Sequence, residues 1–430
     1  MFKSEYEVHL NLNVRGLPLS ATLDINEQSA RLQQEGRQIY RLGLGQSPFP
    51  VPEGVVRALQ ENAFQKDYLP VKGLPALRDA VASYYQRTQG VNFNGGDILI
   101  GPGSKELMFL LQIAYYGELA IPTPSWVSYA PQAHIAGRPV RWLQTRQQNR
   151  WLLMPDELEH LGRIDPTKPR IVILNYPNNP TGCSYTSEQL RELADVARRY
   201  KMIVLSDEIY GELAFAGDHQ SIARYYPEGT IVASGLSKWA GAGGWRLGTF
   251  AFPEPLRWLL DAMAVVASET FTATSAPIQY AAVEAFRGSD DLERYLDNSR
   301  RILSRLSSWI WRQFCAAGIR VARPDGAFYM FPDFESERDR LRQRGIVNST
   351  DLCRRLLDET GVAVLPGVCF GRPATELTVR LAFVDFDGGT ALKAVVDRAE
   401  EVVSDAFLYE QCGRVTTAIE RMVAWVKQPG

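Results

Sequence analysis

The chain reads Arg170-Ile-Val-Ile-Leu-Asn175-Tyr-Pro-Asn-Asn-Pro180-Thr-Gly182 near its middle, a continuous apolar run followed by eight turn-type residues. Apolar runs without alternation are typical of strands that helices cover on both faces of a sheet. Two prolines and a terminal glycine fix the turn, and its asparagines offer amide donors where the strand ends. A rigid surface turn is the plainer interpretation, but so many turn residues at one strand end favour a ligand site.

Short apolar runs alternate with helix-like segments on both sides of this strand. The runs lie at 97–101, 118–121, 202–205, 230–233 and 247–252. Helices are predicted over 104–116 and over 188–199, the second with Thr186 or Ser187 as its cap. The alternation predicts an α/β fold with a mainly parallel sheet covered by helices, and such sheets bind ligands at the carboxyl ends of their strands.

The pattern changes beyond residue 299. Amphipathic helices are predicted at 298–317 and 350–359, and short apolar runs at 362–365 and 377–383. The tail at 392–427 has a helical pattern and is predicted to form two helices with a break near Gly413. We therefore expect a large, ligand-binding α/β domain at 51–299 and a smaller α+β domain made of 1–50 and 300–430.

The composition is that of an ordinary globular enzyme. Of the 430 residues, 45% are hydrophobic and 22% charged, and the net charge of −2 gives no reason to expect nucleic acid or an anionic membrane as a partner. No apolar stretch approaches the length of a membrane-spanning helix, and acids stand where a signal peptide would be apolar. We expect a cytoplasmic protein with five reduced cysteines and no metal site.

Lys238 closes the apolar run that starts at Thr230, and the glycine-rich segment Gly241-Ala-Gly-Gly-Trp-Arg246-Leu-Gly248 follows at once. This setting can keep the amine unprotonated and bring a phosphate group close to it. An unprotonated amine is what Schiff-base chemistry with an aldehyde requires. A strand-end lysine beside a loop is the plainer alternative for this residue taken alone.

Further candidates follow neighbouring strands. Asp207 could pair with a pyridinium nitrogen and Tyr210 could donate to the phenolic oxygen of the same ring, with a helix cap and a core aromatic residue as the alternatives. The segment Gly101-Pro-Gly103-Ser104-Lys105 ends a strand and opens a helix, where backbone N–H groups and the helix dipole form an anion site.

Two more residues have functional interpretations that their positions leave open. Trp126 could stack on a planar ring or lie in the core. Arg380 could bind a substrate carboxylate through two hydrogen bonds or form a structural salt bridge. The glycine clusters at 43–45 and 241–243 lack the G-x-G-x-x-G spacing and no Walker motif occurs, so NAD and ATP are poorly supported.

Taken together, these segments resemble the class I/II aminotransferases, the fold-type I enzymes that use pyridoxal 5'-phosphate. The resemblance covers roughly residues 38–400 and rests on Asn-Asn-Pro-Thr-Gly, Ser-Asp-Glu-Ile-Tyr, Ser-Lys and Gly-Trp-Arg-Leu-Gly in the family's order. It implies that Lys238 forms the Schiff base, the internal aldimine, and that Asp207 holds the pyridine nitrogen.

The resemblance also implies a set of binding residues. They are Gly103, Ser104, Lys105, Ser237 and Arg246 at the cofactor's phosphate, Trp126, Asn179 and Tyr210 at its ring, and Gly45, Asn179 and Arg380 at the substrate's α-carboxylate. Asp67-Tyr68 resembles the family segment whose tyrosine reaches the phosphate in the neighbouring subunit, which implies a homodimer with shared active sites.

The chain departs from the family pattern in three places. Gly235 stands where the family often has a phosphate-binding serine, so Ser234 or Ser237 is expected to supply that contact. The tail beyond residue 400 is longer than the family's, and its role is open. No arginine signals a second carboxylate site, so a preference for aspartate is not supported.

The implied reaction is transamination between an amino acid and a 2-oxo acid by a ping-pong mechanism, in which Lys238 moves the α-proton. A lyase or synthase that uses the same cofactor on the same fold is the nearest alternative. A non-catalytic module that keeps the fold and binds an effector is another, although such modules usually carry a DNA-binding segment and no basic helix-turn-helix pattern occurs here.

Overall fold

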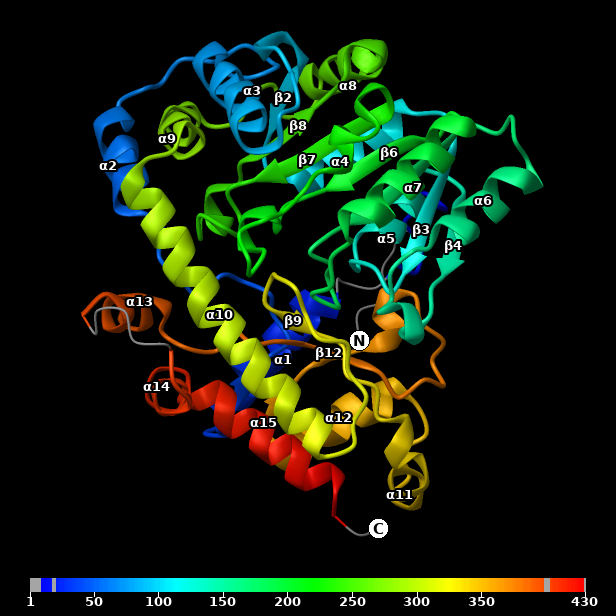
Figure 1. Cartoon of the computed structure of the whole chain (residues 1–430), viewed down its shortest axis with the longest axis vertical. Coiled ribbons are helices and arrows are strands. Elements are labelled where there is room, and N and C mark those ends of the chain that lie inside the picture. The colour runs from blue at the N-terminus through cyan, green and yellow to red at the C-terminus, as the bar shows by residue number, and fades with distance from the viewer. Residues whose placement is uncertain (1–8, 18–20, 398–402, 429–430) are drawn as a thin grey trace.

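A computed structural model of the chain describes residues 9–17, 21–397 and 403–428. The chain forms an upper and a lower part in the view of Figure 1, and the long helix α10 (Asp290–Ala316) runs from one to the other. Within the described ranges, no helix is long and apolar enough to cross a membrane.

The upper part is built on a seven-stranded sheet with the order β2-β8-β7-β6-β5-β3-β4. All its strands are parallel except β8, which is antiparallel to both neighbours. The predicted mainly parallel α/β sheet is thereby confirmed. The strands are β2 Ile98–Gly101, β3 Glu118–Thr123, β4 Val140–Gln144, β5 Arg170–Asn175, β6 Ile203–Asp207, β7 Thr230–Gly235 and β8 Gly248–Ala251.

Helices cover both faces of this sheet, and each face has its own apolar core. Ile171 and Ile173 of β5 pack with α4, α5 and α8 on one face, whereas Val172 and Leu174 pack with α6 and α7 on the other. Because neighbouring side chains of a strand point to opposite faces, both cores need apolar residues and the run is continuous. The helices of the upper part are α2 Glu53–Asn62, α3 Pro75–Gln89, α4 Ser104–Ala114, α5 Tyr129–Ile135, α6 Pro155–Ile164, α7 Ser187–Arg199, α8 Arg257–Ser268 and α9 Ala276–Arg287.

The predicted cap of α7 is confirmed at Thr186. Its hydroxyl accepts the N–H of Gln189 at 3.2 Å, and the Gln189 side chain accepts the N–H of Thr186 at 3.0 Å. This reciprocal capping box starts the helix soon after the turn that ends at Gly182, so the turn itself stays at the carboxyl edge of the sheet.

The lower part carries a three-stranded antiparallel sheet and a separate parallel pair of strands. The order in the sheet is β11-β12-β9, and β1 pairs with β10. The strands are β1 Tyr40–Arg41, β9 Tyr329–Met330, β10 Val362–Ala363, β11 Leu365–Pro366 and β12 Val379–Ala382, and the helices besides α10 are α1 Ala21–Gln34, α11 Arg338–Gln343, α12 Ser349–Thr360, α13 Gly388–Asp397, α14 Asp405–Gln411 and α15 Gly413–Val426.

The tail packs on the lower part. The predicted break near Gly413 is confirmed, since α14 ends at Gln411 and α15 begins at Gly413, but the expectation of a single helix before it is wrong, because α13 ends at Asp397 and α14 begins at Asp405. In α15 the ring of Trp425 lies 4.1 Å from the guanidinium of Arg344, and its Nε1 donates to Glu359 of α12 at 2.7 Å. These contacts fix α15 against α12 and give the extension a structural role in the lower part.

Candidate active site

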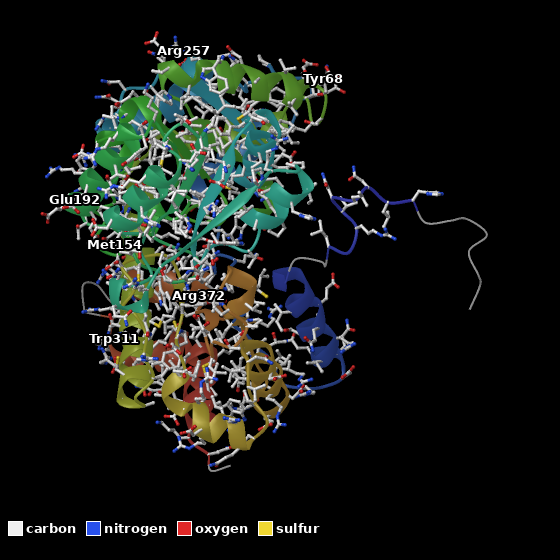
Figure 2. All side chains as sticks on the ribbon, turned by 90° about the vertical axis from the view of Figure 1, so that its right-hand side faces the viewer. Tyr68, Met154, Glu192, Arg257, Trp311 and Arg372 are labelled. Carbon is white, nitrogen blue, oxygen red and sulfur yellow. The ribbon has the colours of Figure 1, made fainter. Side chains whose placement is uncertain are left out.

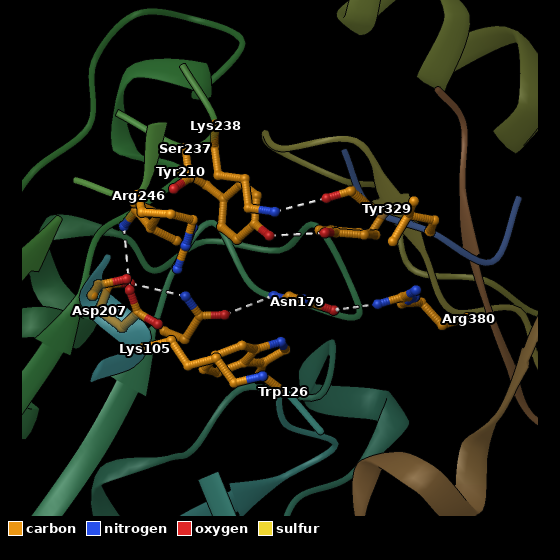
Figure 3. Close-up of a pocket in the computed structure, with 15 residues that line it drawn as sticks. Lys105, Trp126, Asn179, Asp207, Tyr210, Ser237, Lys238, Arg246, Tyr329 and Arg380 are labelled. Carbon is orange, nitrogen blue, oxygen red and sulfur yellow. Dashed lines mark hydrogen bonds between the residues drawn. The ribbon is translucent and has the colours of Figure 1, made fainter. Parts of the chain in front are cut away.

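A cavity of about 220 Å³ lies at the carboxyl ends of β5, β6 and β7, where the upper part meets the lower (Figure 3). It brings together every predicted site residue except Gly103 and Tyr68. The lining residues are Leu44, Gly45, Ser104, Lys105, Trp126, Asn175, Asn179, Asp207, Ile209, Tyr210, Ser237, Lys238, Arg246, Tyr329 and Arg380.

Lys238 follows β7 and points across the cavity toward the lower part (Figure 3). Its Nζ donates to the backbone oxygen of Gly45 at 2.7 Å. Burial and, after it, the nearby cation of Arg380 lower the pKa of Lys238 to about 8. The neutral amine, which is the nucleophilic form, is therefore far more abundant near neutral pH than in a surface lysine.

Asp207 is the last residue of β6 and is 4% exposed. Its carboxylate accepts the hydroxyl of Tyr129 at 2.5 Å and the N–H of Ile209 at 3.4 Å. Burial raises the pKa of Asp207 to about 6, against the lowering effect of these two donors. The carboxylate is thus ionised at neutral pH, in a dry setting where an ionic hydrogen bond is strong.

The turn after β5 is tied to the end of β6 by its asparagines. The side chain of Asn175 donates to the backbone oxygen of Asp207 at 2.9 Å and accepts the N–H of Asn179 at 2.7 Å. These two bonds explain why amide side chains occupy the turn: they join neighbouring strand ends where the sheet's own ladder stops. Asn179, 3% exposed, is thereby held beside Asp207 in the cavity wall.

A cationic corner lies where α4 begins. A Cβ atom at Gly103 would lie 2.2 Å from Nη2 of Arg246, and one at Gly248 would lie 2.0 Å from the N atom of Ser104. Glycines at these two positions therefore let the arginine and the β8 backbone approach the helix N-terminus closely. The positive end of the helix dipole and the guanidinium together favour an anion there.

Lys105 and Trp126 close this corner. The ammonium of Lys105 lies 5.5 Å from the ring centre of Trp126. Loss of hydration and, after it, the charge of Arg246 lower the pKa of Lys105. Both effects disfavour a second positive charge there, and a bound anion would relieve the repulsion.

Arg380 is a buried cation without an acidic partner. It is 1% exposed, its Nη1 donates to Asn179 at 3.4 Å and its Nη2 to the backbone oxygen of Gly43, while its Nε has no partner. No ion pair to it occurs among the residues that the structure describes. Since a buried charge is costly unless it is paired, this arginine suits a carboxylate ligand.

The structure adds site residues that the sequence did not single out. Tyr329, on β9, lines the cavity, and its hydroxyl lies 2.8 Å from that of Tyr210. Tyr129 and Asn175 hold Asp207 and the turn. Tyr129 shares a segment with Trp126 and Asn175 ends the β5 run, so their positions were visible, but the contact of Tyr329 joins residues 119 positions apart.

The question raised by Gly235 has a steric answer. A Cβ at this position would lie 2.5 Å from the backbone oxygen of Leu247 and 2.9 Å from Cα of Gly248, so a serine there would push β7 and β8 apart. Ser237 lines the cavity, whereas Ser234 lies buried within β7. Of the two serines expected to replace it, Ser237 is the one placed to do so.

Two predicted site residues lie outside the cavity. Gly103 precedes α4 and contacts Arg246. Its lack of a side chain leaves the room that the Arg246 guanidinium occupies. Tyr68 is 92% exposed on the upper part (Figure 2) and does not line the cavity of its own chain. A role for its hydroxyl therefore requires the site of another subunit.

The residues present fit pyridoxal 5'-phosphate. The positive charges of Arg246 and Lys105, together with the N-terminus of α4, suit a phosphate group. The face of the Trp126 ring suits a planar ring. Asp207 suits a ring nitrogen that carries a proton, and the amine of Lys238 suits an aldehyde. Arg380 leaves a carboxylate site beside them.

Comparisons with known proteins agree with this chemistry. The family described as aminotransferase class I and II matches residues 37–386. The chain is 31% identical over 399 residues to an aspartate aminotransferase of Geobacillus stearothermophilus, covering 90% of this chain and 96% of that protein. It is also 31% identical over 385 residues to an asparagine–oxo-acid transaminase of Streptococcus mutans, covering 87% and 94%.

A solved structure shows the same architecture. The aspartate aminotransferase of Thermus thermophilus with maleate superposes with a TM-score of 0.83 at 27% identity, covering 97% of this chain and 100% of that one. The resemblance inferred from the motifs is therefore confirmed, and with it the fold. The chain belongs to the class I and II aminotransferases, a family that in general depends on pyridoxal phosphate.

Proposed function

We propose that this aminotransferase binds pyridoxal 5'-phosphate in the cavity around Lys238 and exchanges amino groups between an amino acid and a 2-oxo acid. The observation that carries the proposal is that Lys238, with its lowered pKa, and Asp207, with its raised pKa, line one cavity. Burial shifts the pKa values of both groups toward neutrality, and strongly shifted pKa values within one cavity are typical of acid–base sites.

When bound, pyridoxal phosphate supplies an aldehyde that takes up the amino group and a ring that spreads the negative charge left at the α-carbon. Nζ of Lys238 accepts the proton of the substrate α-carbon. Asp207 holds the proton of the ring nitrogen, and the hydroxyl of Tyr129 holds Asp207 in place. Arg380 orients the substrate through its α-carboxylate, so that the α-hydrogen lies near Lys238.

The remaining proposed roles follow the cavity wall. Trp126 stacks on the ring, and Asn179 and Tyr210 bind its phenolic oxygen. We place the backbone of Gly45 at the carboxylate site, because Gly45 lines the cavity together with Arg380. At the phosphate we place Gly103, Ser104, Lys105, Ser237 and Arg246.

We propose further that 51–299 forms the large domain and that 1–50 with 300–430 forms the small one; residues 1–8, 18–20, 398–402 and 429–430 lie outside the described residues. The position of Tyr68 on the surface supports a homodimer in which it completes the partner's phosphate site. We also propose a cytoplasmic location, because the five cysteines are scattered along the sequence without paired spacing.

For the amino donor we propose an acidic amino acid or its amide. Two relatives cited above are named for aspartate and asparagine. The cavity also carries four cationic side chains, Lys105, Lys238, Arg246 and Arg380, against the single carboxylate of Asp207. The phosphate, the aldehyde and the substrate's α-carboxylate account for these four groups, so no arginine is left for a second carboxylate and the proposed side-chain preference rests on the names of the two relatives.

The alternatives raised by the sequence are less favoured. The relatives cited above carry transaminase names, which favours transamination over elimination. The cavity keeps its lysine, carboxylate and arginine together, which a module without catalysis would not need.

The test is a half-reaction. Cofactor-loaded enzyme receives aspartate or asparagine without a 2-oxo acid, and the absorbance of the lysine-bound cofactor is followed. We expect this absorbance to be lost, a 2-oxo acid to form, and a second 2-oxo acid to restore the signal; Lys238→Ala should show none of these changes. Release of ammonia without recovery would instead indicate a lyase.

A further inference from the structure

Arg372 lies outside the cavity, at the level where the upper and lower parts meet (Figure 2). It follows the short helix at Gly367–Phe370 and belongs to the lower part, yet its side chain is only 8% exposed. A buried arginine is uncommon unless its donors are used, so its partners indicate what it does.

The guanidinium of Arg372 binds both parts of the molecule. On its own segment it forms two hydrogen bonds with the carboxylate of Glu376, at 2.9 and 2.7 Å. Its Nη1 donates to the side chains of Thr123 and Gln144, each at 3.0 Å, and to the backbone oxygen of Thr145 at 3.3 Å. These three acceptors lie at the carboxyl ends of β3 and β4.

Packing adds to these polar contacts. The guanidinium lies 4.6 Å from the ring centre of Trp151, within the range of a cation–π contact. A Cβ atom on the preceding Gly371 would lie 2.8 Å from the ring of Trp142 and 3.0 Å from Cγ2 of Thr123. The segment 367–372 therefore sits directly on the upper sheet.

The same segment touches the active site through Phe370. Its backbone oxygen accepts the N–H of Ser125, the residue before Trp126, at 3.0 Å. Its ring lies 5.2 Å from the guanidinium of Arg380. Phe370 thus contacts the arginine of the carboxylate site on one side and the segment of the ring-stacking tryptophan on the other.

We propose that Arg372 is a positioning residue for substrate binding: it fastens the segment 367–372 to the ends of β3 and β4 and thereby sets Arg380 at a fixed distance from Trp126. This inference rests on the proposed binding of a carboxylate by Arg380. Without the fastening, the lower part keeps its fold, but the two halves of the substrate site are in register for only a fraction of the time. Apparent affinity falls by that fraction.

The test uses Arg372→Met, which keeps much of the apolar length and removes every donor. Binding of two carboxylates without an amino group, maleate and 3-phenylpropionate, is measured by calorimetry on the cofactor-loaded enzyme, and kcat and KM are measured for both substrates. We expect the affinity of whichever carboxylate binds the wild type to fall and both KM values to rise by about tenfold or more, while kcat changes by less than about threefold. Arg372→Lys keeps one donor group, so its carboxylate affinity and KM values should lie between those of the wild type and those of Arg372→Met.

Two controls separate positioning from loss of structure. Arg338→Met removes a similar two-bonded pair with Glu335 inside the lower part and should leave both KM values unchanged. If Arg372→Met does not fold, Thr123→Val carries the same test, since it removes the β3 hydroxyl that accepts from Arg372 and donates to Gln144 at 3.1 Å. We expect Thr123→Val to raise KM in the same direction.

The outcomes distinguish this inference from the proposed function. If the wild type binds a carboxylate, Arg380→Gln loses that binding and folded Arg372→Met retains it at full strength, the positioning role is wrong. If Arg380→Gln leaves carboxylate binding unchanged, the proposed role of Arg380 fails, and the inference fails with it.

Discussion

The side chains of Asp207 and Lys238 both have pKa values that are shifted from their ordinary range. Burial raises the pKa of Asp207 to about 6 and lowers that of Lys238 to about 8, so each charged form is less stable than in water. Both residues could be predicted from the sequence, because each ends an apolar run that closes at the ligand edge of a sheet. The hydroxyl of Tyr129 that holds Asp207 could not, since its partner is fixed only when β5 and β6 pair with their neighbours.

Asp207 has a measurable effect on stability. Because the pKa of Asp207 is raised in the folded state, its favourable contribution to the free energy of unfolding is fully present below pH 4 and is lost as the pH rises through 6. Asp207→Asn removes this loss, so we expect it to stabilise the cofactor-free protein at pH 8 by up to about 3 kcal/mol, because each pKa unit is worth about 1.4 kcal/mol. The gain should shrink toward pH 4.

Urea unfolding of the cofactor-free protein at several pH values checks this prediction. The same variant, once loaded with cofactor, should lose most of its turnover, as expected when a site residue is exchanged for stability. A stability gain that does not depend on pH would contradict the assignment of the shifted carboxyl to Asp207.

At the scale of elements, the strand ends explain what the sequence could and could not predict. The strands β5, β6 and β7 carry continuous apolar runs because both their faces are covered, so they were visible. The edge strand β4 was missed, because its residues Val140–Gln144 are half-buried or exposed and carry no such run. Tyr329 was missed for another reason: β9 has two residues, and only tertiary packing brings it to the cavity.

The end of β7 makes a prediction about Gly235. Since a Cβ there meets the backbone of β8 at 2.5 Å, Gly235→Ala forces apart two paired strands and should destabilise the protein by about 1–3 kcal/mol or more. Gly244→Ala is the matched control, because nothing lies within 4 Å of a Cβ at that position of the following loop. Denaturant unfolding of both variants is the measurement. If the two variants were equally stable, the β7–β8 pairing would accommodate the added methyl group and the prediction would be wrong.

At the scale of the whole molecule, we propose that one chain alone does not complete the site. The cavity holds the lysine, carboxylate and arginines, but Tyr68 lies on the surface of the upper part and away from it. A sequence alone implies such sharing only through likeness to a family. The geometry of the contact depends on a second chain, which no pattern within this one describes.

The proposed sharing of the site predicts complementation between two impaired variants. Lys238→Ala lacks the amine and Tyr68→Ala lacks the side chain offered to the partner, so a mixed dimer has one site with both defects and one with neither. We expect subunits that are unfolded and refolded together to be more active than the average of the two variants refolded separately. Activity equal to that average would contradict a shared site.

The central claim is that Lys238 carries the cofactor and gives it up to an amino acid. Borohydride reduction of the cofactor-loaded enzyme, followed by peptide mass spectrometry, tests this directly when it is done with and without a mixture of the protein amino acids. We predict a pyridoxyl mass on the peptide that contains Lys238, and its loss when the amino acids are added first. A label on another lysine, or one on Lys238 that no amino acid removes, would contradict the account.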